Sequence, residues 1–102
     1  MTDSLYSIQW RTMAREDLRR IIQYIGKDSP TRAAHFGQEL RNKTSLLKEY
    51  PELGRQARPG LSGCRELIVH PNYIIFYRVL SDAQTVQILR VKHAAQQMLE
   101  MR

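Results

Sequence analysis

The fold of this chain is decided by the stretch Cys64-Arg65-Glu66-Leu67-Ile68-Val69-His70-Pro71-Asn72-Tyr73-Ile74-Ile75-Phe76-Tyr77-Arg78-Val79. It is dominated by β-branched and aromatic residues, and its segment at 70–72 has the composition of a tight turn. A second run of the same kind follows at 85–92, after another short turn at 81–84. We therefore predict three adjacent strands near 64–70, 73–80 and 85–92, joined as antiparallel hairpins.

The residues before this stretch predict a short strand and a first helix. Residues 5–10 alternate between apolar and polar side chains, which is typical of a strand. Apolar residues then recur at helical spacing from Leu18 to Ile25. Thr12 is the expected N-cap of this helix, and Gly26 is the residue expected to end it.

A second helix is expected to begin with Ser29 as its N-cap and Pro30 at its first position, and to stop at Tyr50-Pro51. A connection of about four residues favours an antiparallel pair of helices. The side chains expected to face the core share the helical period and are Ala33, Phe36, Gly37, Leu40, Thr44 and Leu47.

These elements predict a single α+β domain over residues 1–102, in the order β-α-α-β-β-β. The N-terminal αα-hairpin is expected to pack on one face of a small antiparallel sheet. Residues 52–63 are expected to be a loop or an irregular entry into a strand. The tail from 93 to 102 is expected to be a short helix or a segment that orders against a partner.

The composition limits the class of protein and its partners. The chain has 16 basic and 10 acidic residues, a net charge of +6, which favours nucleic acid, an acidic protein partner, or no specific partner and a role in solubility alone. The one cysteine fits a reducing compartment. We find neither a membrane-spanning run nor a signal peptide, so the expected location is the cytoplasm, without membrane contact.

Known patterns of catalytic and metal sites are not matched. The three histidines fall on three different elements, the spacings fit no zinc pattern, and no glycine-rich phosphate loop is present, so no metal or cofactor is expected. Cys64 is interpreted as a structural thiol. The basic residues of the strands remain, because a charge inside a sheet needs a partner or water.

Strand alternation indicates which side chains share a face. Arg65 aligns with Leu67 and Val69. Arg78 aligns with Ile74 and Phe76, opposite Tyr73, Ile75, Tyr77 and Val79, and Arg90 aligns with Ile88 and Lys92, opposite Leu89, Val91 and His93. Two interpretations stay open: each arginine pairs with an acid such as Glu66, or the arginines converge on an open face and bind a phosphate or carboxylate.

The chain resembles the RelE/ParE superfamily of bacterial toxins from toxin–antitoxin modules, which arrest growth and stabilise plasmids. The resemblance covers nearly the whole chain. It rests on the following segments: Trp10, Ala14, Asp17-Leu18 and Ile21-Ile22-Gln23-Tyr24-Ile25; Pro51 with Gly54-Arg55; Arg65-Glu66-Leu67; Tyr73 to Val79; and Ile88-Leu89-Arg90-Val91-Lys92-His93-Ala94. It implies the same fold, an αα-hairpin on a small antiparallel sheet.

The RelE-type branch implies an endoribonuclease that cuts mRNA on the ribosome. Its pattern places basic residues where this chain has Glu66, Ile68, Ile74 and His93, and a tyrosine where it has Leu99. If this branch applied, the remaining candidates for catalysis would be His93, Arg65 and Lys92.

The ParE-type branch is more similar, through Arg-Glu-Leu before His-Pro-Asn-Tyr, then Tyr-Arg-Val and Arg-Val-Lys-His-Ala, although Gln96-Gln97 stand where the family often has arginine and aspartate. It implies inhibition of DNA gyrase by binding, with no catalytic residue, and an acidic cognate antitoxin through which alone DNA is contacted. A third possibility is a non-toxic relative that only binds an antitoxin. The expected partner-binding residues are Arg65, Arg78, Arg90, Lys92, Tyr73 and His93.

Overall fold

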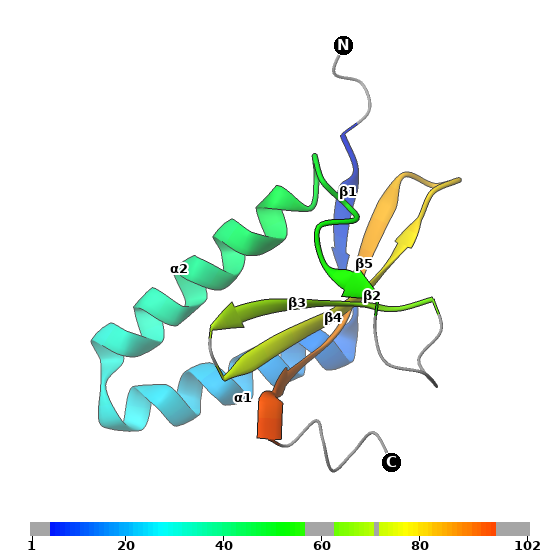
Figure 1. Cartoon of the computed structure of the whole chain (residues 1–102). Coiled ribbons are helices and arrows are strands. Elements are labelled where there is room, and N and C mark those ends of the chain that lie inside the picture. The colour runs from blue at the N-terminus through cyan, green and yellow to red at the C-terminus, as the bar shows by residue number, and fades with distance from the viewer. Residues whose placement is uncertain (1–4, 57–62, 71, 96–102) are drawn as a thin grey trace.

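The computed structural model describes residues 5–56, 63–70 and 72–95, and it confirms the α+β fold (Figure 1). The elements in chain order are β1 (Ser7–Trp10), α1 (Thr12–Asp28), α2 (Pro30–Leu46), β2 (Arg55–Gln56), β3 (Arg65–His70), β4 (Tyr73–Leu80) and β5 (Thr85–His93). No helix among these elements is both long enough and apolar enough to cross a membrane. The predicted tail continues over residues 96–102, which lie outside the described residues.

The five strands form one sheet in the order β1-β5-β4-β3-β2. The strands β2 to β5 pair antiparallel, as the two hairpins predict, whereas β1 runs parallel to β5. The predicted antiparallel sheet is therefore corrected to a mixed one, because β1, which the helical hairpin separates from the other strands, joins the edge of the sheet beside β5 in the parallel direction. The short strand β2 lies in the segment that was expected to be a loop or an irregular strand entry.

The two helices cover one face of the sheet, and the core lies between them (Figure 1). All six side chains of the predicted stripe on the second helix are buried, including Leu47, which directly follows α2. The strand residues of this core, which come from one face of β3, β4 and β5, are Leu67, Val69, Tyr73, Ile75, Tyr77, Val86, Ile88 and Val91.

Both predicted ends of the first helix are corrected by the structure. Arg11, not Thr12, is the N-cap of α1, and its side chain makes no capping hydrogen bond. The helix continues past Gly26 to Asp28. A Cβ atom on Gly26 would lie 3.7 Å from the Ala33 Cβ atom, so this glycine lies close to α2 rather than ending α1. The helix ends because Ser29 precedes Pro30 and is extended, with φ −156° and ψ 102°.

The start of α2 follows the prediction. The Ser29 hydroxyl accepts a hydrogen bond from the Arg32 N–H at 3.1 Å, and Pro30 occupies the first turn. The helix itself ends at Leu46, a few residues before the predicted stop at Tyr50-Pro51.

The alternation predicted for the last strand is wrong beyond Ile88. The register between β4 and β5 shifts between Phe76 and Tyr77, so that Tyr77 lies opposite Ile88 but Phe76 lies opposite Arg90. Such a bulge inserts one residue into β5, and Ile88 and Val91 both reach the core as a result.

Candidate functional site

Arg90 forms part of a buried ionic contact that joins β5 to α1. Its Nε and Nη2 atoms donate to the Asp17 carboxylate at 2.7 and 3.0 Å, and Arg20 donates to the same carboxylate at 3.2 Å. The Val91 N–H donates to Asp17 Oδ2 at 3.0 Å. The pairing of β1 with β5 ends at Ile88, so this carboxylate satisfies a strand N–H that β1 does not reach.

The protonation of Asp17 reflects two opposing effects. Burial raises the pKa of this carboxyl group, but the hydrogen bonds from Arg90 and from the Val91 N–H, with the positive charges beside it, outweigh burial and hold its pKa below the usual range. Asp17 is therefore ionised at neutral pH, and Arg90 has the acidic partner that one of the two interpretations expected.

Arg65 belongs to a second cluster, at the other end of β4. Its Nη1 atom donates to the Gly54 carbonyl at 2.7 Å. The buried Tyr77 hydroxyl donates to the Pro51 carbonyl and accepts from the Gly54 N–H, both at 2.8 Å. A Cβ atom on Gly54 would lie 2.5 Å from the Glu66 carbonyl oxygen, so only glycine fits here. Arg65 thus binds the segment that leads into β2.

Arg78 lies on the sheet face away from the helices. Its Nε atom donates to Gln87 Oε1 at 2.9 Å, and Gln87 Nε2 donates to Gln9 Oε1 at 2.6 Å. These contacts link β4, β5 and β1. The three arginines therefore bind three different groups, and of the two open interpretations the one in which they converge on one anion-binding face is wrong.

The same open face is apolar or ion-paired at the positions where the resemblance placed nuclease residues. Glu66 is 3% exposed and pairs with Arg55 at 3.2 Å. Ile68 is 52% exposed, whereas Ile74 and Phe76 are buried.

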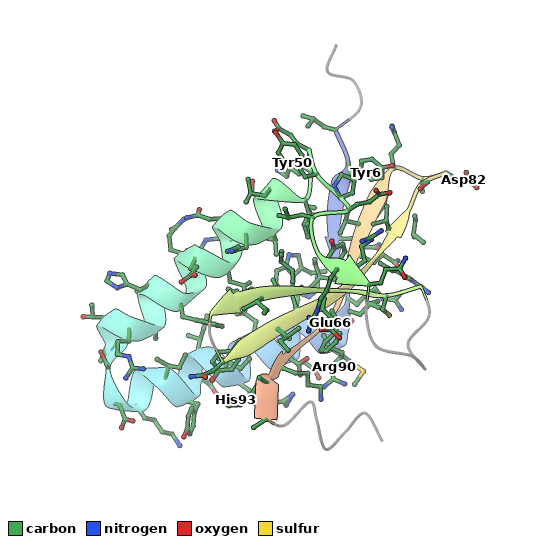
Figure 2. All side chains as sticks on the ribbon, viewed as in Figure 1. Tyr6, Tyr50, Glu66, Asp82, Arg90 and His93 are labelled. Atoms are coloured by element: carbon green, nitrogen blue, oxygen red, sulfur yellow. The ribbon has the colours of Figure 1, made fainter. Side chains whose placement is uncertain are left out.

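A groove of about 1280 Å³ opens between the helical hairpin and the C-terminal end of β5. Figure 2 shows Arg90 and His93 along this end of β5, on the side of α1. Four of the six predicted partner-binding residues line the groove, and Arg65 and Arg78 do not. The charged and aromatic side chains that line it are Asp17, Arg20, Tyr24, Lys27, Asp28, Arg32, His35, Phe36, Glu39, Tyr73, Arg90, Lys92 and His93.

Aromatic rings form the wall of the groove where β4 meets α2. The Tyr73 ring centre lies 4.9 Å from that of Phe36 and 5.1 Å from that of His93, the second pair edge to face. Burial, and then the nearby Tyr24, raise the pKa of the Tyr73 hydroxyl, so it stays protonated at neutral pH. Tyr24 itself is 70% exposed.

The Nδ1 atom of His93 takes part in a contact at the C-terminal end of β5. It accepts a hydrogen bond from the Ala95 N–H at 3.2 Å, and the Ala94 N–H donates to the Asn72 carbonyl at 2.7 Å. The candidate nuclease partners of His93 are not all nearby. His93 lies opposite Tyr73 on β4 and Arg65 lies opposite Tyr77, which is about 13 Å farther along the strand. His93, Lys92 and Arg65 therefore do not form one site.

Sequence reasoning missed the helical half of the groove. Arg20, Tyr24, Lys27 and Arg32 come from α1 and α2 and meet β5 only in the folded chain. The available signal was Tyr24, a large aromatic residue at the edge of the apolar stripe of α1. Within the described ranges, no three histidine, cysteine or acidic side chains gather as metal ligands would.

Comparison with known proteins agrees with this fold. Residues 8–98 match the family described as ParE toxin of type II toxin-antitoxin system, parDE. The chain is 43% identical to Toxin RelE2 of Caulobacter vibrioides over 86 residues, which cover 84% of this chain and 90% of that protein.

Two solved structures share the fold over most of their length. A chain of the chromosomal ParDE system of P. aeruginosa superposes with a TM-score of 0.72 at 22% identity, covering 89% of this chain and 98% of the other. A chain of the RelBE2 toxin–antitoxin complex of Mycobacterium tuberculosis gives 0.65 at 27% identity, covering 87% and 98%. The family match spans most of the chain, and we conclude that the protein is a toxin of the ParE family of type II toxin–antitoxin systems, within the ParE/RelE superfamily.

Proposed function

We propose that this toxin arrests growth in the cytoplasm by binding and inhibiting DNA gyrase, with no catalytic step of its own. The observation that carries the proposal is the separation of Arg65 from His93 and Lys92, which leaves the nuclease candidates apart. A ribonuclease needs a base, an acid and a phosphate-binding group within reach of one bond. A groove that combines aromatic and basic side chains is better suited to binding another macromolecule.

We propose that the groove is where an acidic cognate antitoxin neutralises the toxin. A solved relative is a toxin–antitoxin complex, and this likeness supports an antitoxin as partner. The groove carries the basic residues Arg20, Lys27, Arg32 and Lys92 around an aromatic wall, which suits an acidic amphipathic segment. Recognition of the operator DNA then belongs to the antitoxin.

The experiment that tests the target compares the two activities with one preparation of toxin. We expect micromolar toxin to block supercoiling of relaxed plasmid by gyrase and to leave ribosome-bound mRNA intact in a primer-extension assay. Antitoxin added in equimolar amount should restore supercoiling. Unimpaired supercoiling at micromolar toxin would contradict the proposal.

The second candidate is a RelE-like ribosome-dependent endoribonuclease, favoured by the name of the 43% identical relative, Toxin RelE2. It predicts cleavage of mRNA within codons and loss of growth arrest in His93→Ala. Under the gyrase proposal, His93→Ala changes antitoxin binding and produces no change in mRNA, because there is no cleavage to lose.

A further inference from the structure

A row of arginines follows one side of α1, away from the groove. Arg11, Arg15 and Arg19 are spaced by four residues, and all three are exposed. The Arg15 N–H donates to the Arg11 carbonyl at 3.1 Å, which places Arg11 one turn below Arg15. Four residues advance a helix by about 6 Å and rotate it by only about 40°, so successive arginines lie nearly above one another.

Arg41 of α2 extends this row across the helical hairpin. Its Nη1 atom lies 3.9 Å from the point where a Cβ atom of Gly37 would be, and Ile22 Cδ1 of α1 lies 3.5 Å from the same point. Ile22 is on the side of α1 that carries Arg15 and Arg19, three residues after Arg19. We call Arg11, Arg15, Arg19 and Arg41 the arginine ridge.

The ridge has no acidic counterpart. None of the ion pairs in the described part of the chain involves its four members. Glu16, the nearest acid in the sequence, lies about 100° from Arg15 and about 60° from Arg19 around the helix, and it forms an ion pair with neither of them. Like charges one turn apart repel each other, so the row is unfavourable for the isolated toxin and becomes favourable beside an anion.

The chemistry of the ridge favours a nucleic-acid backbone over a protein. Interfaces between proteins usually have an apolar or aromatic centre. The large exposed apolar side chains of the two helices are Met13, Tyr24 and Leu46, and each lies about 120° or more around its helix from the ridge arginines of that helix. Guanidinium groups bind phosphate oxygens in pairs and need no apolar neighbour. A row about 12 Å long can reach more than one phosphate of one DNA strand.

We propose that the arginine ridge binds the phosphate backbone of duplex DNA, without reading its sequence, and that the toxin uses it to contact the DNA held by gyrase. The second half of this inference rests on the proposed function. It departs from the expectation that DNA is contacted only through the antitoxin. Operator recognition remains with the antitoxin, because the ridge contacts phosphates and no base edges.

The first experiment measures DNA binding without gyrase. Fluorescence polarisation with a labelled 20-base-pair duplex should show salt-dependent binding by the toxin. The double variant Arg15→Glu/Arg19→Glu should weaken binding at least about tenfold at low salt and reduce the slope of log K against log salt by about two. Arg15→Lys/Arg19→Lys keeps the charge and should stay within a few-fold of the unmodified toxin.

A charge-matched control separates the ridge from the overall charge of +6. Lys43 and Lys48 lie outside both the ridge and the groove. Lys43→Glu/Lys48→Glu should change binding only slightly, and an equal loss in both double variants would overturn the assignment to the ridge. Binding of a polyglutamate peptide in place of DNA would also overturn the proposal. So would an affinity for an RNA duplex more than about tenfold higher than that for the DNA duplex.

The second experiment repeats the supercoiling assay with these variants, after circular dichroism has shown that they are folded. The ridge variant should need about tenfold more toxin for the same inhibition, and the control pair should not. Full inhibition by the ridge variant would overturn the contact with gyrase-held DNA and leave the gyrase target intact. DNA binding through the ridge without any inhibition of gyrase by unmodified toxin would instead contradict the proposed function alone.

Discussion

The Asp17 side chain accepts a backbone hydrogen bond from β5 that a neighbouring strand would otherwise accept. The carboxylate is 5% exposed, and it accepts hydrogen bonds from a backbone N–H of β5 and from two arginines. A buried charge costs several kcal/mol in lost hydration, about as much as such contacts return. The arrangement therefore adds little net stability, but it fixes the position of β5 on α1 and with it one wall of the groove.

Asp17→Asn should destabilise the protein by about 3 kcal/mol, the lower end of the range for broken buried pairs, because Arg90 would lose its counter-charge. Urea denaturation at pH 7 measures this loss. Asp17→Asn combined with Arg90→Met should recover part of it, since the second change removes the unpaired charge. A double variant less stable than Asp17→Asn alone would contradict this account.

The same pair predicts how stability depends on pH. The pKa of Asp17 is lower in the folded protein than its ordinary value of 3.8. Its contribution is therefore fully present above pH 3.8 and is lost as the pH falls through the folded pKa. The difference in unfolding free energy between the unmodified protein and Asp17→Asn should be constant from pH 5 to 7 and should shrink below pH 3.8.

Tyr77→Phe should cost about 2 kcal/mol, because the buried Gly54 N–H and the Pro51 carbonyl would both lose their partner. Thermal unfolding monitored by circular dichroism measures the change. The matched control is Tyr50→Phe, whose side chain is 57% exposed and should leave the melting temperature unchanged. A Tyr77→Phe protein as stable as this control would show that the hydroxyl does not hold the segment before β2.

For the helices and strands, the spacing of apolar residues predicted which side chains are buried better than it predicted where each element begins and ends. The whole buried stripe of α2 was foreseen, because a helix against a sheet must bury every third or fourth residue. The continuation of α1 through Gly26 was not, because that glycine serves a contact with α2 that only the folded hairpin reveals. The bulge in β5 was missed for the same reason, since a register shift depends on both paired strands.

The repulsion between neighbouring side chains of the arginine ridge should lower the stability of α1. Arg15→Glu replaces two like-charge neighbours by two opposite ones and places an acid near the helix N-terminus. We expect the free energy of unfolding to rise by about 0.5–1 kcal/mol. Chemical denaturation measures the gain, which should fall in high salt. A variant that is more stable yet binds DNA less well would show that the row serves binding at the expense of stability.

At the scale of the whole molecule, the groove and the arginine ridge lie on different sides of α1. Tyr24 of the groove and Arg19 of the ridge are about 140° apart around the helix, so an antitoxin in the groove can leave the ridge uncovered. Four of the residues that line the groove are among those predicted from the strands to bind a partner, namely Tyr73, Arg90, Lys92 and His93. The groove residues of α1 and α2 could not be predicted, because their position next to β5 depends on how the helical hairpin crosses the sheet.

Tyr24→Ala should weaken antitoxin binding by about 2 kcal/mol, or roughly thirtyfold, if the groove is the antitoxin site. Its stability should change little, since the side chain is 70% exposed. Isothermal titration calorimetry with the antitoxin measures the loss. The control is Tyr50→Ala, an exposed tyrosine at the end of the molecule away from Arg90 and His93 of the groove (Figure 2), and equal effects of the two changes would contradict the assignment.

The parallel pairing of β1 with β5 has a consequence for how this toxin is made. Gln9 and Gln87, which are hydrogen-bonded across these strands, are 78 positions apart. β1 is therefore synthesised long before the strand with which it pairs. Closing so long a loop is entropically costly and makes folding slow. A nascent chain on the ribosome cannot complete the sheet before Thr85–Ile88 has emerged. Until then the chain lacks the strand with which β1 pairs, and it cannot adopt the fold described here.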